Sequence, residues 1–229
     1  MTVSLLLLTA AVSAAPPEQV ERTTSSAILL DGEETPVHWD DGDTFFAPGR
    51  NLKARLVGYN TLESYGAVHR FGPGETRLLE VAHEATALAR SKSWVCTTQS
   101  GEGGYGRKSV DCPGLRAALL EAGLAHAFSV KGPAPKDDLA AQQRGITARL
   151  GMWSEGPPST MVTSVHSLDE KPGAVTTYNR VLNIETGEAS KRAHKDTHQA
   201  CERVCVGDSC LLYVPYQQRY GDQRAECLK

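Results

Sequence analysis

The chain has 229 residues, of which 40% are hydrophobic and 22% are charged, so it can bury a core and is not expected to be disordered. This length allows one sizeable domain with an appendage, or two small domains. The formal net charge of -3 gives no overall attraction for nucleic acid, although a locally positive site is compatible with it.

The first 14 residues predict a signal peptide. An apolar run, Leu5 to Leu8, is followed by small residues, and Val12-Ser13-Ala14 satisfies the small-residue rule for cleavage after Ala14. No Lys or Arg precedes the run, so an uncleaved apolar tail is the alternative. No other stretch of the sequence is long and apolar enough to span a membrane. We therefore expect a secreted or periplasmic protein with no membrane attachment after cleavage, beginning with a polar leader over residues 15–35.

The next 120 residues predict an α+β domain. Three strands separated by turn residues are followed by a helix, a strand hairpin with a Gly-rich turn, and two further helices. Five strands with helices after the third strand and at the end are typical of an OB-like barrel, so we expect a five-stranded OB-like β-barrel with three helices. The expected strands cover 36–39, 44–47, 52–57, 93–97 and 107–112, and the helices cover 78–89, 115–122 and about 137–150.

The six cysteines predict disulfides, because their even count follows an export signal. Cys96 and Cys112 lie on strands expected to pair, so a cross-strand bridge between them is plausible. The other four, which predict two more bridges, are Cys201, Cys205, Cys210 and Cys227.

A change of composition at residues 156–159, Gly-Pro-Pro-Ser, marks a boundary. We expect a domain over 36–155 and a small disulfide-rich C-terminal extension over 156–229. Within the extension, His194 and His198 have the spacing of a zinc site with two of the cysteines. Disulfides are the better interpretation in an exported chain.

Four short segments together could hydrolyse a phosphodiester. In chain order they are Asp41-Gly42-Asp43-Thr44, Arg55, Asn60-Thr61-Leu62-Glu63 and Tyr105-Gly106-Arg107. Arginine binds phosphate through a planar, two-pronged contact that stabilises developing negative charge. A hard divalent cation takes oxygen ligands and can orient water, while a carboxylate accepts the proton of the attacking water. Each segment alone is common in loops and on solvated strand faces, so only the combination is informative.

The order of these segments resembles the staphylococcal-nuclease (thermonuclease) family. Gly123-Leu124-Ala125 and Gly151-Met152-Trp153 extend the likeness, which covers about residues 36 to 155. The resemblance implies a calcium-dependent endonuclease that cleaves DNA or RNA and leaves 3′-phosphate ends. It implies no obligate protein partner.

The resemblance also implies a role for each matching residue. Arg55 and Arg107 would bind the phosphate, and Glu63 would be the general base. Ca²⁺ would be held by Asp43, Asn60 and the backbone carbonyl of Thr61. Asp41 would support these ligands without binding the ion itself. Tyr105 would stack on the substrate base, and Phe128 is near the position of a second stacking residue, although a core role is equally compatible with it.

Asn60 departs from the family pattern, which has an aspartate there. Asparagine keeps one oxygen ligand but removes a negative charge, so weaker calcium binding is expected. The main alternative is therefore a nuclease-fold module that binds nucleic acid with weakened or lost catalysis. A third interpretation assigns the function to the extension, as an adhesion or inhibitor module, but no legible chemistry supports it.

Overall fold

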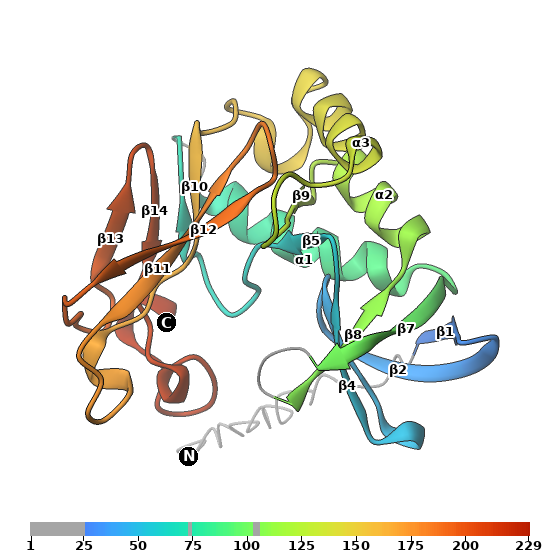
Figure 1. Cartoon of the computed structure of the whole chain (residues 1–229), viewed down its shortest axis with the longest axis horizontal. Helices are drawn as coiled ribbons and strands as arrows, with labels where there is room; N and C mark the ends of the chain where they lie inside the picture. The colour runs from blue at the N-terminus through green and yellow to red at the C-terminus, as the bar shows by residue number, and fades with distance from the viewer. Residues whose placement is uncertain (1–25, 73–74, 103–105) are drawn as a thin grey trace, which may run out of the picture.

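The structure is a computed structural model that describes residues 26–72, 75–102 and 106–229. The expected signal peptide at residues 1–14 lies outside the described residues. The protein has an α+β fold in which a closed barrel carries three α-helices on one side, and the C-terminal sheets lie on the other side of α1 from the barrel (Figure 1). The expected fold class is confirmed at this level.

The barrel has six strands rather than the expected five, in the order β1-β2-β3-β4-β8-β7. The extra strand is β1, which pairs antiparallel with β2 and parallel with β7. It lies inside the segment 15–35 that the sequence assigns to a leader. Ile28 and Leu30 are fully buried, but two apolar positions beside a polar segment are a weak strand signal. The barrel strands are β1 Ser26–Leu30, β2 Glu33–Asp41, β3 Thr44–Ala47, β4 Leu52–Leu56, β7 Val95–Glu102 and β8 Lys108–Asp111.

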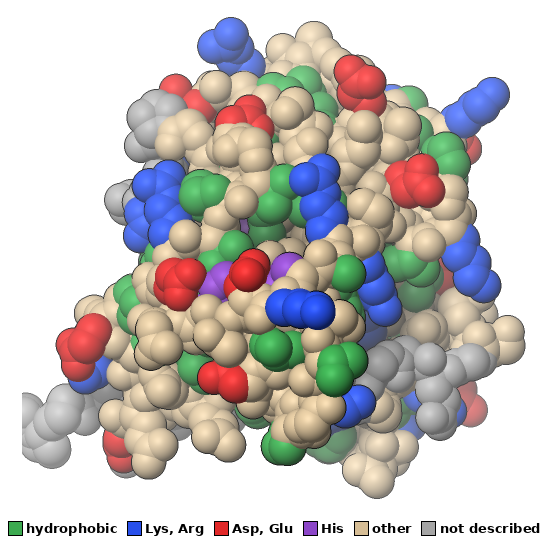
Figure 2. Space-filling model, turned by 60° about the vertical axis from the view of Figure 1, so that its left-hand side comes forward, with side chains coloured by type: hydrophobic (Ala, Val, Ile, Leu, Met, Phe, Trp, Pro, Cys, Tyr) green, Lys and Arg blue, Asp and Glu red, His purple; other side chains and the backbone are tan. Residues whose placement is uncertain are grey.

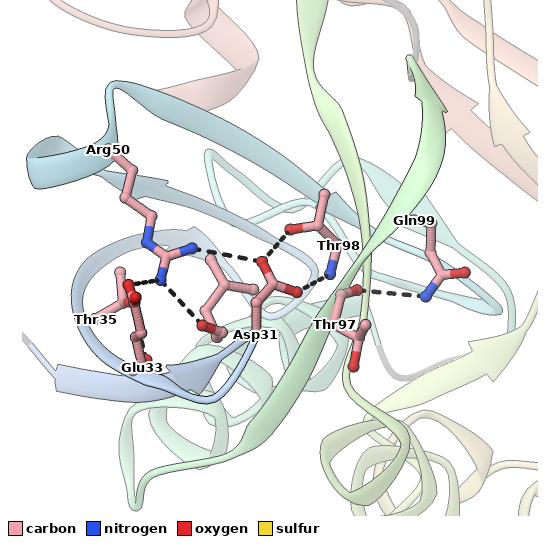
Figure 3. A network of polar contacts seen from close by, with 8 residues as sticks. Asp31, Glu33, Thr35, Arg50, Thr97, Thr98 and Gln99 are labelled. Atoms are coloured by element: carbon pink, nitrogen blue, oxygen red, sulfur yellow. Dashed lines mark hydrogen bonds and ion pairs between the residues drawn. The ribbon is translucent and has the colours of Figure 1, made fainter.

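A polar network closes the barrel where β1 and β7 pair over only two residues (Figure 3). Asp31, in the left-handed turn after β1, accepts hydrogen bonds of 2.8 Å from both the backbone N–H and the hydroxyl of Thr98. These bonds, the backbone one first, lower the pKa of Asp31. Arg50 donates to the Leu30 carbonyl at 3.0 Å and to Glu33 at 2.8 Å. The network therefore ties β1, β2 and β7 together at one end of the barrel.

The three α-helices are α1 Glu75–Arg90, α2 Pro113–Glu121 and α3 Lys136–Thr147. Helix α1 turns a face of small and aliphatic side chains, including Ala82, Ala85 and Ala89, into the main core. Helix α3 begins at Lys136, one residue before the expected start near 137, and ends at Thr147, before the expected end near 150. Among the described residues, no helix is long and apolar enough to cross a membrane.

The C-terminal extension forms two small sheets that are joined to the rest of the fold. Strands β10 Thr160–Ser164, β11 Thr177–Asn183 and β12 Ala189–His194 make one, and β13 Arg203–Val206 and β14 Ser209–Leu212 continue into β6 His69–Arg70 in the other. A separate two-stranded sheet pairs β5 Tyr59–Thr61 with β9 Ala125–Ala127. Since β6 belongs to the first 155 residues, the second extension sheet crosses the boundary expected from sequence.

Buried side chains also cross that boundary. Met161, Leu182 and Ile184 of the extension belong to the main core. The buried Gln142 of α3 accepts from the Ala127 N–H at 2.8 Å and donates to the Ile184 carbonyl at 2.7 Å. The extension therefore packs as part of the same folding unit.

All six cysteines form disulfides, as the sequence predicts. Cys96 and Cys112 pair as expected, with 4.2 Å between their Cα atoms. In the extension, Cys205–Cys210 spans the β13–β14 hairpin, and Cys201–Cys227 attaches the end of the chain to the segment before β13. The zinc alternative fails for Cys201 and Cys205, since both are in bridges.

Two glycines of the sequence pattern, Gly123 and Gly151, meet backbone to backbone. Both have positive φ, at 66° and 52°, and the Gly123 carbonyl accepts from the N–H of Met152 at 2.9 Å. A Cβ on Gly123 would lie 2.2 Å from the Leu150 carbonyl oxygen. Glycine is required at position 123 both for its φ and for this close approach.

We expect Gly123→Ala to lower the free energy of unfolding by about 3 kcal/mol, since strain from positive φ adds to a clash with backbone atoms. Gly132→Ala is the control, because Gly132 has a φ of 71° but no atom within 4 Å of a built Cβ. That variant should lose only about 1 kcal/mol. Equal losses in urea unfolding of the two variants would show that the Gly123 contact is unimportant.

His69 on β6 is buried, and neither of its ring nitrogens has a hydrogen-bond partner among the described residues. Burial, followed by the nearby His126, lowers the pKa of His69 to about 3. When a histidine has a lower pKa in the folded protein than in the unfolded chain, its full contribution to stability is present only above the unfolded pKa, near 6.5. That contribution is lost as the pH falls from there toward about 3.

We therefore expect His69→Leu to reduce the acid sensitivity of the fold. Between pH 7 and pH 4.5, the free energy of unfolding of the wild type should fall by about 2 kcal/mol more than that of the variant. The reason is that pH 4.5 lies roughly two pH units below the unfolded pKa of histidine. Urea unfolding of both proteins at the two pH values measures the difference. Parallel losses would mean that His69 can be protonated in the folded state.

Candidate active site

The acidic turn between β2 and β3 carries the two aspartates of the site, Asp41 and Asp43. The Asp43 N–H donates to the Asp41 carboxylate at 2.9 Å, and the Asp43 side chain is almost completely buried. A Cβ on Gly42 would lie 2.7 Å from the Thr61 methyl and 3.0 Å from the Ala85 Cβ. Glycine at 42 therefore lets the turn pack against β5 and α1, which fixes the position of Asp43.

Asp43 accepts three different donors. The Thr61 N–H reaches Oδ2 at 2.8 Å, the Thr44 hydroxyl reaches Oδ1 at 3.0 Å, and Nη1 of Arg55 also donates to Oδ1. Arg55 on β4 pairs with Thr44 on β3, so strand register directs the guanidinium toward the turn. A buried carboxylate with this set of partners is a stable anchor.

Arg55 also connects the turn to β5. Its Nη2 donates to Oδ1 of Asn60 at 2.5 Å. The Tyr59 hydroxyl, next along β5, donates to the Gly42 carbonyl at 2.9 Å. One guanidinium therefore bridges Asp43 and Asn60, and its side chain is still 28% exposed, so solvent reaches it.

The carboxylates of the site repel one another. Burial and then the charge of Asp43 raise the pKa of Asp41 well above its usual range, although Arg55 opposes this. Burial and Asp43 likewise raise the pKa of the half-buried Glu63. Burial would lower the pKa of Arg55, but Asp43, Asp41 and Glu63 raise it overall. The carboxylates of the site therefore favour a bound proton or a neighbouring cation.

The structure brings together most of the residues expected to form the site. Asp41, Asp43, Arg55, Asn60 and Thr61 are linked by the contacts above. Glu63 follows on the same loop, and Arg55 and Arg107 both lower its pKa through their positive charges. The expected stacking residue Tyr105 lies outside the described residues.

Phe128 follows β9, the partner strand of β5. Its ring centroid is 6.3 Å from that of His126 and 5.8 Å from the Arg180 guanidinium, and the side chain packs partly against the main core. The ring therefore has a packing role, which the sequence left open, and a cation from the extension lies beside it.

The oxygen groups near Asp43 fit a hard divalent cation in kind. Thr61, whose N–H donates to the carboxylate of Asp43, supplies a buried hydroxyl with no partner among the described residues, and Asn60 supplies an amide oxygen. These are the oxygen donors that Ca²⁺ binds. Arg55 already contacts Asp43 and Asn60, so a cation would share these oxygens with the guanidinium. No group of three or more His, Cys, Asp and Glu side chains in the described ranges is arranged to hold a metal ion.

A segment that the sequence analysis missed reaches the same loop. Arg219 of the extension lowers the pKa of Glu63 more than Arg55 or Arg107 does. Tyr220, next to it, has a pKa raised to about 12 by burial and then by the charges of Glu63 and Asp41. The Cys201–Cys227 bridge holds this segment, but the sequence alone does not reveal which cysteines pair.

The face that carries the C-terminal sheets has no field of a single sign (Figure 2). Figure 2, turned so that the C-terminal sheets come forward, shows basic and acidic side chains interspersed on this face. This agrees with the formal net charge of -3. Attraction for a polyanion would therefore depend on a few local cations such as those around Glu63.

No family model matches the chain, and no curated protein matches it significantly.

Proposed function

We propose that this protein is a nuclease that hydrolyses phosphodiester bonds of DNA or RNA. The observation that carries this proposal is the guanidinium of Arg55, which is fixed by Asp43 and Asn60 on a side chain that is still partly exposed, with Glu63 following Asn60 in the chain. A fixed arginine beside a half-buried carboxylate combines a phosphate binder with a base. This is the pair of groups that phosphodiester hydrolysis needs.

In this mechanism Arg55 and Arg107 bind the nonbridging oxygens of the scissile phosphate. They offset the negative charge that develops there, and the donors of Arg55 are already oriented by Asp43 and Asn60. Glu63 accepts the proton of the attacking water. Burial and Asp43 raise the pKa of Glu63, which makes its carboxylate a stronger base than an exposed glutamate.

Calcium is part of the proposal. Asp43, Asn60 and the backbone carbonyl of Thr61 would hold the ion, with Asp41 orienting Asp43 through the turn. A bound Ca²⁺ supplies positive charge to the phosphate and orients water. By the family resemblance, the products carry 3′-phosphate ends. The three disulfides support export to an oxidising compartment, such as the periplasm or the exterior.

A second candidate is a nucleic-acid-binding module with weakened catalysis. Asn60 favours it, since its amide oxygen is bound to Arg55 and carries no charge to attract a metal. Digestion of plasmid DNA with calcium, and with EDTA instead, separates the two candidates. The nuclease should cut only with calcium, whereas the module should bind the plasmid and leave it intact.

Glu63→Gln should lower kcat by about 100-fold or more with little change in KM, because glutamine keeps the shape and cannot accept the proton. Activity requires the ionised carboxylate, so it should fall as the pH decreases through the Glu63 pKa. Since that pKa is raised, the acidic limb of the wild-type profile should lie above the usual glutamate value of about 4.3. The exposed Glu34→Gln is the control for removing a carboxylate elsewhere. Near-normal turnover of Glu63→Gln would refute the mechanism.

Calcium binding by the free protein should be weak, in the millimolar range of extracellular sites. Asn60→Asp adds a charged ligand and should tighten calcium about tenfold, or roughly 1 kcal/mol. Calorimetric titration of calcium and activity against calcium concentration measure both effects.

The exposed Asn183→Asp is the matched control, since it makes the same charge change on the extension. If Asn60→Asp changes neither binding nor the calcium dependence of cleavage, residue 60 does not face the metal. If Asn60→Asp cleaves nucleic acid and the wild type does not, the natural protein is a binding module.

A further inference from the structure

The chain after β14 folds back over the loop that carries Glu63. The C-terminal residues are held there by several contacts with loop residues 65 and 66. Arg224 Nη2 donates to the Tyr65 carbonyl, and Leu228 lies against Gly66, where a Cβ would be 2.2 Å from its Cδ2. The Cys201–Cys227 bridge attaches the same segment to the residues before β13. The segment 215–228 is therefore a built part of the surface around the site.

Arg219 is the basic residue of this segment that lies on the site. Its Nε donates to the Val214 carbonyl at 3.0 Å, which orients the guanidinium. The guanidinium lies over the Tyr65 ring, 5.1 Å from its centroid, and 5.9 Å from that of Tyr216. Tyr65 also meets Tyr220 edge-on, with 5.6 Å between ring centroids. Aromatic contacts on both sides fix an arginine while it keeps its charge.

The charge of Arg219 is not used in an ion pair with any described residue: no carboxylate oxygen in the described ranges lies within the 4.0 Å limit of a salt bridge. The side chain is partly exposed, and Tyr216 and Tyr220 beside it are 76% and 59% exposed. An oriented cation near exposed aromatic rings is a typical arrangement for binding single-stranded nucleic acid, because phosphate contacts the cation and bases stack on the rings.

We propose that Arg219 binds the phosphate next to the scissile one, while Tyr216 and Tyr220 stack on the neighbouring bases. The extension thereby forms a second substrate subsite. This inference rests on the proposed nuclease function, and it makes a single-stranded polynucleotide the preferred substrate class. The effect of Arg219 on the pKa of Glu63 agrees with this placement, since it puts the guanidinium charge close to the proposed base.

The test compares a single-stranded oligonucleotide with a small phosphodiester that has one phosphate, such as bis(p-nitrophenyl) phosphate. Arg219→Gln should raise KM for the oligonucleotide about tenfold more than for the small diester, because only the longer substrate has a neighbouring phosphate. The slope of log KM against the logarithm of salt concentration should decrease by about 0.7, which is the value for one phosphate contact on a single strand. Arg219→Lys should recover part of both effects.

Arg203→Gln is the matched control, because Arg203 is an exposed arginine of the same extension. Tyr220→Ala is a second variant in case Arg219→Gln does not fold, and it should also weaken the oligonucleotide selectively. An Arg219→Gln protein with unchanged KM and salt dependence on the oligonucleotide would overturn the subsite. An equal loss on both substrates would also overturn it, since Arg219 would then act on the reacting centre. If the wild type cleaves neither substrate, the proposed function itself fails.

Discussion

The buried carboxylate of Asp43 is the constraint on which the candidate site depends. A carboxylate that is 1% exposed needs several donors, and β3, β4 and β5 each supply one. This requirement brings Thr44, Arg55 and Thr61 to a single point. The barrel wall and the short β5 strand are thereby tied together, and the loop that continues β5 carries Glu63 into the same region. The geometry of the site follows from satisfying one buried charge.

The arrangement also explains how a protein with a net negative charge could bind a polyanion. The cations that matter are few, and each is oriented by a neighbour rather than by an overall field. Arg55 is held by a carboxylate and an amide, and Arg219 is held by a carbonyl and aromatic rings. Fixed donors of this kind lose little side-chain entropy on meeting a phosphate. Specificity for phosphate is therefore compatible with an otherwise mixed surface.

The sequence predicted local features well and long-range pairings poorly. Residues 52–57 alternate and residues 44–47 have strand composition, and the structure has strands at Leu52–Leu56 and Thr44–Ala47. Strand β1 was missed because only Ile28 and Leu30 are fully buried, beside a polar segment, and its pairing with distant β7 leaves no local pattern. The acidic turn and Arg55 were found as candidates since each has a recognisable residue type. Arg219 was missed because contacts between segments far apart in the sequence, such as Arg224 with the Tyr65 carbonyl and β14 with β6, bring its segment to the loop of Glu63.

The extension changes what counts as the functional unit. Its sheet continues into β6, and its apolar side chains enter the main core, so removing it would expose both. Its terminal segment covers the loop after Glu63, which makes it a structural neighbour of the proposed chemistry. The central claim is that these fixed groups hydrolyse a phosphodiester. The most direct measurement follows binding and cleavage of one end-labelled oligonucleotide by the full-length mature protein, with calcium and with EDTA. The account predicts cleavage in calcium that yields 3′-phosphate ends and stops in EDTA. Tight binding without cleavage at any calcium concentration would contradict it.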